Sequence, residues 1–349
     1  MENRRSFLKK ILVTSLVAHF PSILMAETNQ SFLIKSFGDL PSSDNIHRVL
    51  SAGPVADILL LSLVPEKLLG ISTRPLADSQ KLFFSSHIQS LPLTGRFAGR
   101  GTTASLEKVI QMKPDVIVDI GSIAPTYIST AKRVNKQTNI PYILMNGSLA
   151  ETPQQLTHLG EILGVKERGQ KLADYAQKVL SQTHNIAHKA TESSPLKVYS
   201  ARGADGLETG LAGSIHTEVM DCIGAKNVAA DAGEKIISRV SMEQLMLWQP
   251  DVIIAMDQHF YDKVQTDPLW QRLPAVKNKR VYYAPKLPFG WLDQPPSINR
   301  LLGVSWLSHV LYPELLSYDD YAKNIIEYYQ LFYGYSLSDE TLAQLTGTI

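Results

Sequence analysis

Cysteine is almost missing from this chain, which has Cys222 alone among 349 residues. A single cysteine excludes an intramolecular disulfide and a zinc site built from several cysteines. Net charge is also small, at +1 with neutral histidines, so bulk electrostatics indicate neither nucleic acid nor an anionic membrane as a partner. The composition, 44% hydrophobic and 19% charged, is that of a globular protein, and the length is sufficient for two domains.

Common catalytic signatures are missing as well. The chain contains no Gly-x-Ser-x-Gly elbow, no His-Glu-x-x-His, no Walker loop and no dinucleotide fingerprint. Residues 95–101 carry the glycines of a phosphate loop, but no Gly-Lys-Ser/Thr follows them, so nucleotide binding is not expected. We therefore predict a protein that is not an enzyme and has no cofactor. A periplasmic enzyme that contains a cofactor is the alternative from a different functional class.

The N-terminus has the layout of an export signal. A basic segment, Arg4–Lys10, precedes the mostly apolar stretch Ile11–Ala26, and polar chain follows. The apolar stretch is too short for a membrane span. We predict that residues 1–26 are a signal peptide cleaved after Ala26, and that the mature chain is soluble in the periplasm. No cysteine lies near this point, which excludes a lipid anchor through an N-terminal cysteine.

The export route stays open between two alternatives. Arg4–Lys9 resembles a twin-arginine signal, although Asn3 stands where serine or threonine is usual. An ordinary Sec signal that happens to contain two arginines is the other interpretation.

A fourteen-residue pattern occurs twice. Residues 105–118 read SLEKVIQMKPDVIV and residues 241–254 read SMEQLMLWQPDVII, 136 residues further along the chain. In both copies the serine can cap a short amphipathic helix, the Pro-Asp pair ends it, and an apolar run follows as a buried strand. Such an offset has the size of a domain rather than of a solenoid repeat. The pattern predicts two lobes of one plan with a ligand cleft between them.

Strand-like and helix-like segments alternate through both halves, which is typical of parallel sheets covered by helices. We predict an α/β fold of two Rossmann-like lobes, residues 27–150 and 191–349, joined by one long spine helix at 151–190. Gly164 and Gly169 are expected to mark a break in that helix. The C-terminal tyrosines and phenylalanines are interpreted as core residues. Further predictions are a flexible stretch at 27–45, a strand at 67–72 and a long functional loop at 73–104.

The two repeat copies, the helix between them and the segment PLWQRLPAVKNKRVYYAP together resemble the periplasmic substrate-binding proteins of iron-complex and cobalamin ABC importers. The segments ARGADGLETGLAGS and LPFGWLDQPPSINRLLG resemble its metal-complex branch. This resemblance implies two lobes on a rigid helix, with cargo held between them. Its implied partners are a permease dimer in the inner membrane and a cytoplasmic ATPase. It also implies that one glutamate of each lobe docks onto the permease, by position Glu107 and Glu243. We expect a monomer.

Ligands of open α/β sheets lie at the carboxyl ends of strands, and polar or aromatic segments follow several predicted strands here. Guanidinium groups suit carboxylate, phosphate or oxyanion ligands, and aromatic rings provide flat walls for a chelate. Asp293 is expected to pair with an arginine or to contact the ligand. The predicted ligand-binding set is Arg96, Phe97, Arg100, Ser122, Tyr127, Arg202, Arg239, Phe289, Trp291 and Asp293.

The leading hypothesis for the cargo is an anionic metal complex, an iron–siderophore type chelate. A molybdate- or tungstate-like oxyanion would need a small pocket rich in donors and without aromatic walls. Haem would need an axial ligand, for which Tyr127 or His259 would serve. His216 and His259 are the candidates for coordinating a metal directly.

Overall fold

The computed structural model describes residues 32–97, 101, 103–192, 195–233 and 236–347. The predicted signal peptide and Arg100 lie outside these residues. Within the described residues, no helix is both long and apolar enough to cross a membrane.

The N-terminal lobe is built on a four-stranded sheet in the order β1-β4-β3-β2. β2, β3 and β4 run parallel, whereas β1 pairs with β4 in the antiparallel sense. The prediction that residues 27–45 form a flexible stretch is wrong for residues 34–37, because they form β1. The strands are β1 (Ile34–Phe37), β2 (Val49–Ser51), β3 (Val116–Gly121) and β4 (Tyr142–Asn146). The helices are η1 (Ser43–Asn45), α1 (Pro54–Leu63), α2 (Asp78–Lys81), α3 (Ser86–Gln89), α4 (Leu106–Met112), α5 (Pro125–Thr138) and η2 (Leu149–Glu151).

Two sequence expectations for this lobe need correction. Residues 67–72 form only isolated bridges, Val49 to Leu68 and Ile71 to Leu93, rather than a strand. The passage 73–104 is not wholly irregular, because α2 and α3 lie within it. This segment packs onto the core through Phe83 and Phe84, which lie between the two helices, and through Ile88 of α3.

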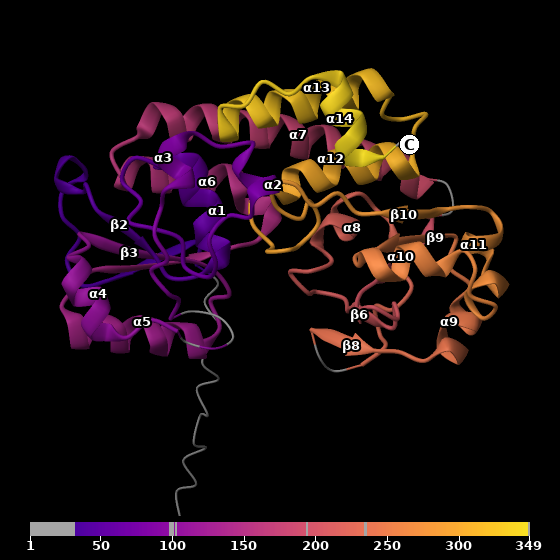
Figure 1. Cartoon of the computed structure of the whole chain (residues 1–349), viewed down its shortest axis with the longest axis horizontal. Coiled ribbons are helices and arrows are strands. Elements are labelled where there is room, and N and C mark those ends of the chain that lie inside the picture. Colours follow the sequence, from indigo (N-terminus) through magenta and orange to yellow (C-terminus); the bar gives the residue numbers. More distant parts are fainter. Residues whose placement is uncertain (1–31, 98–100, 102, 193–194, 234–235, 348–349) are drawn as a thin grey trace, which may run out of the picture. The chain divides into compact units, whose positions relative to one another are not determined.

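The C-terminal lobe holds a parallel sheet in the order β10-β9-β5-β7 and a two-stranded antiparallel sheet, β6-β8. Its strands are β5 (Lys197–Ala201), β6 (Glu208–Gly210), β7 (Lys226–Asn227), β8 (Ile237–Arg239), β9 (Val252–Ala255) and β10 (Val281–Tyr283). Its helices are α8 (Glu218–Cys222), α9 (Met242–Trp248), α10 (Gln258–Val264), η3 (Trp270–Arg272) and α11 (Pro274–Lys277). The predicted α/β architecture of two lobes with parallel strands is confirmed (Figure 1).

The repeated sequence forms the same local structure in each lobe. Ser105 caps α4 by accepting a hydrogen bond from the Lys108 backbone N–H at 3.2 Å, and Ser241 caps α9 in the same way. Lys113 and Gln249 end the two helices in the left-handed conformation, and the Pro-Asp pair follows each of them. The apolar runs that come next are β3 and β9, and every residue of both strands is buried.

The repeated aspartate explains how each copy is anchored to its sheet. Asp115 accepts hydrogen bonds from the backbone N–H groups of His47 and Arg48, each at 2.8 Å, just before β2. Asp251 accepts one from the Lys197 N–H at 2.9 Å, at the start of β5. These carboxylates tie each repeat copy to the start of the first parallel strand of its lobe, β2 or β5.

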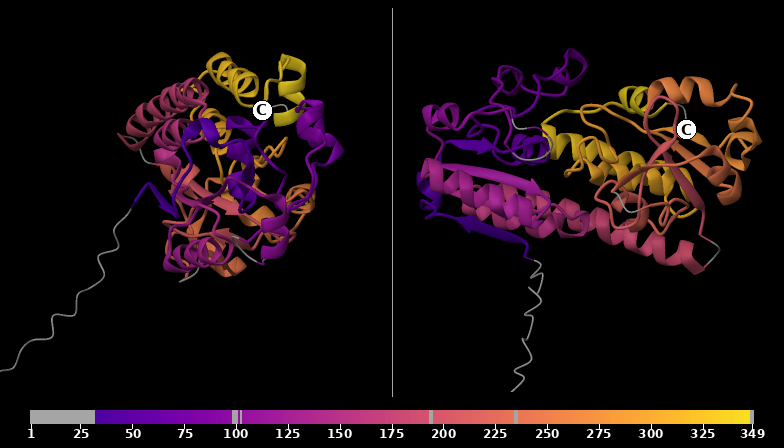
Figure 2. Two further views of the ribbon diagram at one scale, coloured as in Figure 1. Left: turned by 90° about the vertical axis from the view of Figure 1, so that its left-hand side faces the viewer. Right: turned by 90° about the horizontal axis from the view of Figure 1, so that it is seen from below.

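The predicted spine consists of two helices, α6 (Thr152–Ile162) and α7 (Lys166–Glu192). The predicted break occurs at Gly164, which has a left-handed φ of +70°. Gly169 instead lies inside α7, where it packs against Gly160 of α6. A Cβ on Gly169 would lie 2.7 Å from the carbonyl oxygen of Leu156. The chain therefore folds back at Gly164, and α7 alone is the long helix (Figure 2).

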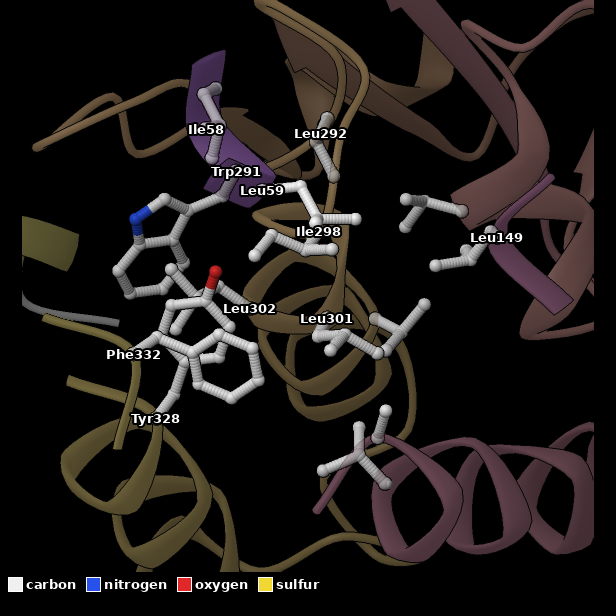
Figure 3. Packing of buried hydrophobic residues seen from close by; sticks show 14 of the residues in the cluster. Ile58, Leu59, Leu149, Trp291, Leu292, Ile298, Leu301, Leu302, Tyr328 and Phe332 are labelled. Atoms are coloured by element: carbon white, nitrogen blue, oxygen red, sulfur yellow. The ribbon is translucent and has the colours of Figure 1, made fainter. Parts of the chain in front are cut away.

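The C-terminal helices pack against both lobes rather than only the second. α12 (Arg300–Leu311) contacts α7 and α8, and α13 (Tyr318–Tyr328) leads into the π-helical turn η4 (Tyr329–Tyr333) and then to α14 (Asp339–Thr346). Phe83 and Phe84 of the N-terminal lobe meet Tyr329 and Tyr333 edge-on, at ring distances of 5.4 and 5.2 Å. The interpretation of these C-terminal rings as core residues is confirmed, and Figure 3 shows Tyr328 and Phe332 within the cluster.

Candidate functional site

The carboxyl ends of the C-terminal strands bring together a group that we call the cation cluster: Arg202, His216, Lys286 and Asp293. Arg202 directly follows β5, and its Nη1 pairs with Oδ2 of Asp293. The same oxygen lies 2.9 Å from Nδ1 of His216. Asp293 has a fully buried side chain, whereas the side chains of Arg202 and His216 are 13% and 23% exposed. One buried carboxylate thus orients two partly exposed basic groups.

Lys286 adds a further positive charge to the cluster. It lies three residues after β10, and its Nζ donates a hydrogen bond to the Met256 carbonyl at 2.6 Å. Burial lowers the pKa of Lys286, and the neighbouring Arg202 lowers it further, while Asp257 and Asp293 act in the opposite direction. The sequence analysis missed this lysine, although it follows a strand just as Arg202 does.

The charge balance of the cluster is incomplete. Oδ1 of Asp293 is buried and has no hydrogen-bond partner among the described residues. Against three basic groups, Arg202, His216 and Lys286, the cluster holds one carboxylate. The excess of basic groups over carboxylates suits an anion, because charge-assisted hydrogen bonds are the strong ones in a partly desolvated site.

A pocket of about 240 Å³ lies between the two lobes and shares Lys286 with the cation cluster. Its N-lobe wall comes from α1 and the loop after it, including Pro54, Asp57 and Arg74. Its other wall is the segment 286–295, which includes Phe289. The two walls are tied together where Nε2 of Gln80 donates to the Pro288 carbonyl at 2.6 Å.

Asp57 is the buried carboxylate of this pocket. Its oxygens accept hydrogen bonds from the backbone N–H of Ser72 at 3.1 Å and from the Ser72 hydroxyl at 2.7 Å. Burial raises the pKa of Asp57 to about 6, and hydrogen bonds from Ser51 and Ser72 oppose this rise. Asp57 therefore fastens the loop after α1 to the helix, which shapes the N-lobe wall.

Other predicted N-lobe residues lie outside the pocket lining. Nε of Arg96 donates to the Gly101 carbonyl at 2.7 Å, so this guanidinium is bonded to its own loop. Phe97 is buried against Tyr142, with ring centroids 6.0 Å apart. Ser122 is exposed after β3, and Tyr127 is half-buried on α5. The structure therefore gives Phe97 a packing role in the N-terminal lobe.

Predicted residues of the C-terminal lobe divide into four kinds: the cation cluster, an exposed ion pair, the core and the pocket wall. Arg202 and Asp293 form an ion pair in the cation cluster. Pairing with an arginine was one of the two expectations for Asp293. Arg239 instead forms an exposed pair with Asp205. Trp291 is a core residue with no exposed surface, and its indole N–H donates to the Leu287 carbonyl at 2.8 Å (Figure 3). An indole without exposed surface offers no face to a ligand, so of the three predicted aromatic walls only Phe289 lines the pocket.

The two histidines proposed as metal ligands lie in different settings. His216 belongs to the cation cluster, whereas His259 is exposed in the first turn of α10. In the described part of the chain, no three His, Cys, Asp or Glu side chains are grouped in a way that could hold a metal ion. Direct coordination by either histidine stays a prediction.

The two predicted docking residues occupy equivalent places. Glu107 and Glu243 lie in the first turns of α4 and α9, and both are exposed. The Ser241 hydroxyl lowers the pKa of Glu243 by a hydrogen bond, which favours its anionic form. In Figure 1, α4 and α9 lie along the side of residues 32–349 that faces away from α7 and α13.

Comparison with known proteins places this architecture in a family. The family model described as periplasmic binding protein matches residues 77–287. The molybdate-binding protein MolA of Haemophilus influenzae is 25% identical over 77% of this chain and 82% of its own length. The Fe(3+)-citrate-binding protein YfmC of Bacillus subtilis is 25% identical over 62% of this chain and 68% of its own.

A solved structure agrees over most of both chains. The ABC transporter solute binding protein of Sulfurospirillum deleyianum superposes with a TM-score of 0.80 at 30% identity, covering 88% of this chain and 95% of that one. The family consists of transport proteins without enzymatic activity. From the repeated lobes, the long helix α7 and these matches, we conclude that the chain belongs to the periplasmic binding protein family and is the substrate-binding component of an ABC importer.

Proposed function

We propose that this protein captures a compact, metal-containing anion at the cation cluster and the adjoining pocket, and delivers it to the permease dimer of its importer. The observation that carries the proposal is the pairing of Arg202 and His216 with one oxygen of Asp293, with Lys286 near enough for its pKa to respond to the charge of Asp293. Arg202 is held in place before cargo arrives, so little side-chain entropy is lost when it binds an oxyanion.

Size and wall chemistry favour an oxyanion of the molybdate or tungstate type over a siderophore chelate. The pocket of about 240 Å³ is smaller than the roughly 300–1,000 Å³ typical of sites for drug-sized ligands. Of the aromatic rings expected to line a siderophore site, only Phe289 lines the pocket, because Phe97 and Trp291 are buried. Similarity to a molybdate-binding protein supports the same choice.

A small ferric chelate such as iron citrate is the second candidate. Phe289 gives the pocket one apolar wall, and a citrate-type ligand would present carboxylates to Arg202 and Lys286. Similarity to an Fe(3+)-citrate-binding protein supports this candidate. Haem has less support, since neither Tyr127 nor His259 lines the pocket.

The test is calorimetric titration of the mature protein with molybdate, tungstate, sulfate and ferric citrate. We expect molybdate and tungstate to bind and sulfate to bind more weakly. Arg202→Ala should weaken binding by about 1.5–3 kcal/mol, the contribution of a charged hydrogen bond. Arg239→Ala is the matched control, because that arginine pairs at the surface with Asp205. Binding of ferric citrate alone would reverse the order of the two candidates, and equal affinity of both variants would place the site elsewhere.

Metal analysis together with native mass spectrometry of protein purified from its own periplasm would identify the cargo directly. Molybdenum or tungsten without an organic mass is the expected result. Iron with a chelator mass would favour the second candidate.

A further inference from the structure

The pocket wall of the C-terminal lobe is held in place by two hydrogen bonds to one carbonyl group. Lys286 and Phe289 of this wall line the pocket. Between them, the Leu287 carbonyl accepts hydrogen bonds from the Tyr329 hydroxyl at 2.6 Å and from the Trp291 indole N–H at 2.8 Å. A carbonyl oxygen has two lone pairs, so these two donors use its full capacity. The backbone next to Lys286 is therefore fixed by both of them.

The two donors tie the wall to different parts of the chain. Trp291 lies four residues beyond Leu287, so its bond only closes the segment on itself. Tyr329 lies 42 residues away, in the π-helical turn η4, and its bond attaches the wall to the C-terminal helices. The Tyr329 side chain has no exposed surface and does not line the pocket that the described residues form. Any effect of Tyr329 on cargo must therefore be indirect.

Aromatic packing keeps Tyr329 in position to donate. Its ring meets the rings of Phe83 and Tyr333 edge-on, each at a centroid distance of 5.4 Å. Burial raises the pKa of Tyr329, so the hydroxyl keeps the proton that it donates to the Leu287 carbonyl. The bond between the wall and η4 is thus made by an immobilised donor.

The two pocket-lining residues beside this carbonyl differ in how much they depend on it. The ring of Phe289 also packs against one ring from the N-terminal lobe and one from η4, at centroid distances of 5.9 and 6.4 Å. The contacts of Lys286 are at the far end of its side chain. There Nζ donates to the Met256 carbonyl at 2.6 Å and lies 5.3 Å from the centroid of the Tyr283 ring. The backbone that carries Lys286 is held from the next residue, Leu287.

We propose that Tyr329 is a positioning residue of the binding site: by holding the Leu287 carbonyl, it keeps Lys286 where the cargo anion binds. The proposal rests on the proposed function. A binding group must be held within about 0.5 Å of its productive position, and packed neighbours that do not touch the ligand supply this precision. Tyr329 fits this description, since it is buried, packed between rings and bonded to the wall.

Tyr329→Phe tests the proposal, because it removes the hydroxyl and keeps the ring. The mature variants are titrated calorimetrically with molybdate and with ferric citrate. We expect Tyr329→Phe to weaken binding about two- to tenfold, which corresponds to the usual net contribution of one hydrogen bond. Tyr175→Phe is the matched control, because the Tyr175 hydroxyl is also buried and donates to the Asn324 carbonyl at 2.7 Å, between α7 and α13. That variant should lose a similar amount of stability in urea and keep the wild-type affinity.

A double-mutant cycle with Lys286→Met distinguishes positioning from a general structural effect. If Tyr329 acts through Lys286, Tyr329→Phe should weaken binding by less than about twofold in a chain that already carries Lys286→Met. The same fold loss with and without Lys286 would overturn the proposal. Binding of Tyr329→Phe with the affinity of Tyr175→Phe would overturn it as well.

Failure of the proposed function would give a different result. Lys286→Met and Arg202→Ala would then both bind like the wild type, or the wild type would bind neither anion, and the positioning role would fall with the site. If Lys286→Met weakens binding and Tyr329→Phe does not, only the positioning role is refuted and the proposed site stands.

Discussion

Asp293 shows how one side chain sets the electrostatics of the binding region. Its carboxylate binds Arg202 and His216 with the same oxygen and has no access to solvent. A buried charge of this kind is costly unless it is paired, so the two basic groups are held where they stand. The result is a pair of pre-oriented basic groups at the site that we propose for the cargo.

Asp119 is a second buried carboxylate, and it leads to a prediction about pH. It lies on β3 and accepts a hydrogen bond from the Tyr142 hydroxyl at 2.9 Å. Burial raises its pKa from 3.8 to about 7. Between these values the folded chain keeps a proton that the unfolded chain has lost, so the free energy of unfolding declines as pH rises.

We expect Asp119→Asn to remove this decline, which should amount to roughly 2–3 kcal/mol between about pH 5 and pH 7.5. Urea unfolding at the two pH values measures it. Asp231→Asn, at an exposed position, is the control and should keep the wild-type slope. An unchanged slope in Asp119→Asn would mean that this carboxyl group does not titrate within the window.

At the scale of elements, the contact of α6 with α7 depends on two glycines. Gly160 and Gly169 face each other so closely that a Cβ on either would lie about 3 Å from the other's Cα, at 2.9 and 3.0 Å. The hairpin brings the first turns of the long helix against α6 and so joins α7 to the N-terminal lobe. Sequence alone suggested that Gly169 interrupts a helix, whereas its role is to let two helices approach.

Gly169→Ala should therefore destabilise the protein although alanine is the better helix former. Alanine gains up to about 1 kcal/mol of helix propensity, but its Cβ would press on a backbone oxygen, at a typical cost of about 1–3 kcal/mol for overpacking. We expect a net loss in the free energy of unfolding, measured in urea. Gln170→Ala, at the exposed neighbouring position, should change it by less than about 0.5 kcal/mol. A stabilised Gly169→Ala variant would contradict the close packing.

At the scale of the whole described region, Arg300 joins the two lobes. It lies at the start of α12, is 2% exposed, and donates from Nη2 to the Gly147 carbonyl of the N-terminal lobe at 2.6 Å. It also pairs with Glu218 of α8, which accepts a hydrogen bond from the Leu149 N–H at 2.8 Å. Ser297 adds a hydrogen bond from its hydroxyl to the Val55 carbonyl at 2.7 Å. These bonds hold the lobes at a set spacing around the pocket.

Removing this connection should lower the free energy of unfolding. Arg300→Met leaves Glu218 without its cation in a largely buried place, and breaking a buried pair from one side typically costs about 3–5 kcal/mol. Lys178→Met is the control, because Lys178 and Glu327 form a half-exposed pair whose loss should cost less than about 1 kcal/mol. Scanning calorimetry measures both. Equal stability of the two variants would refute a connecting role for Arg300.

The sequence by itself determined the local units of this protein. Ser105 and Ser241 as caps, the Pro-Asp ends and the buried runs of β3 and β9 are short-range features, and each was read correctly from neighbouring residues. The repetition of that unit was sufficient to infer two lobes. β1 was missed for two reasons. Apolar and polar residues alternate only weakly along it, and its pairing partner β4 lies far along the chain.

Only the tertiary structure decided which side chains meet at the site. Arg202 and Asp293 are 91 residues apart, and His216 and Asp293 are 77 apart, so no local pattern could join them. Arg96 and Arg239 looked equivalent to Arg202 in sequence, yet each bonds to a nearer group, Gly101 or Asp205. Ion pairing depends on distances of a few ångströms between strand ends, which spacing along the chain does not encode.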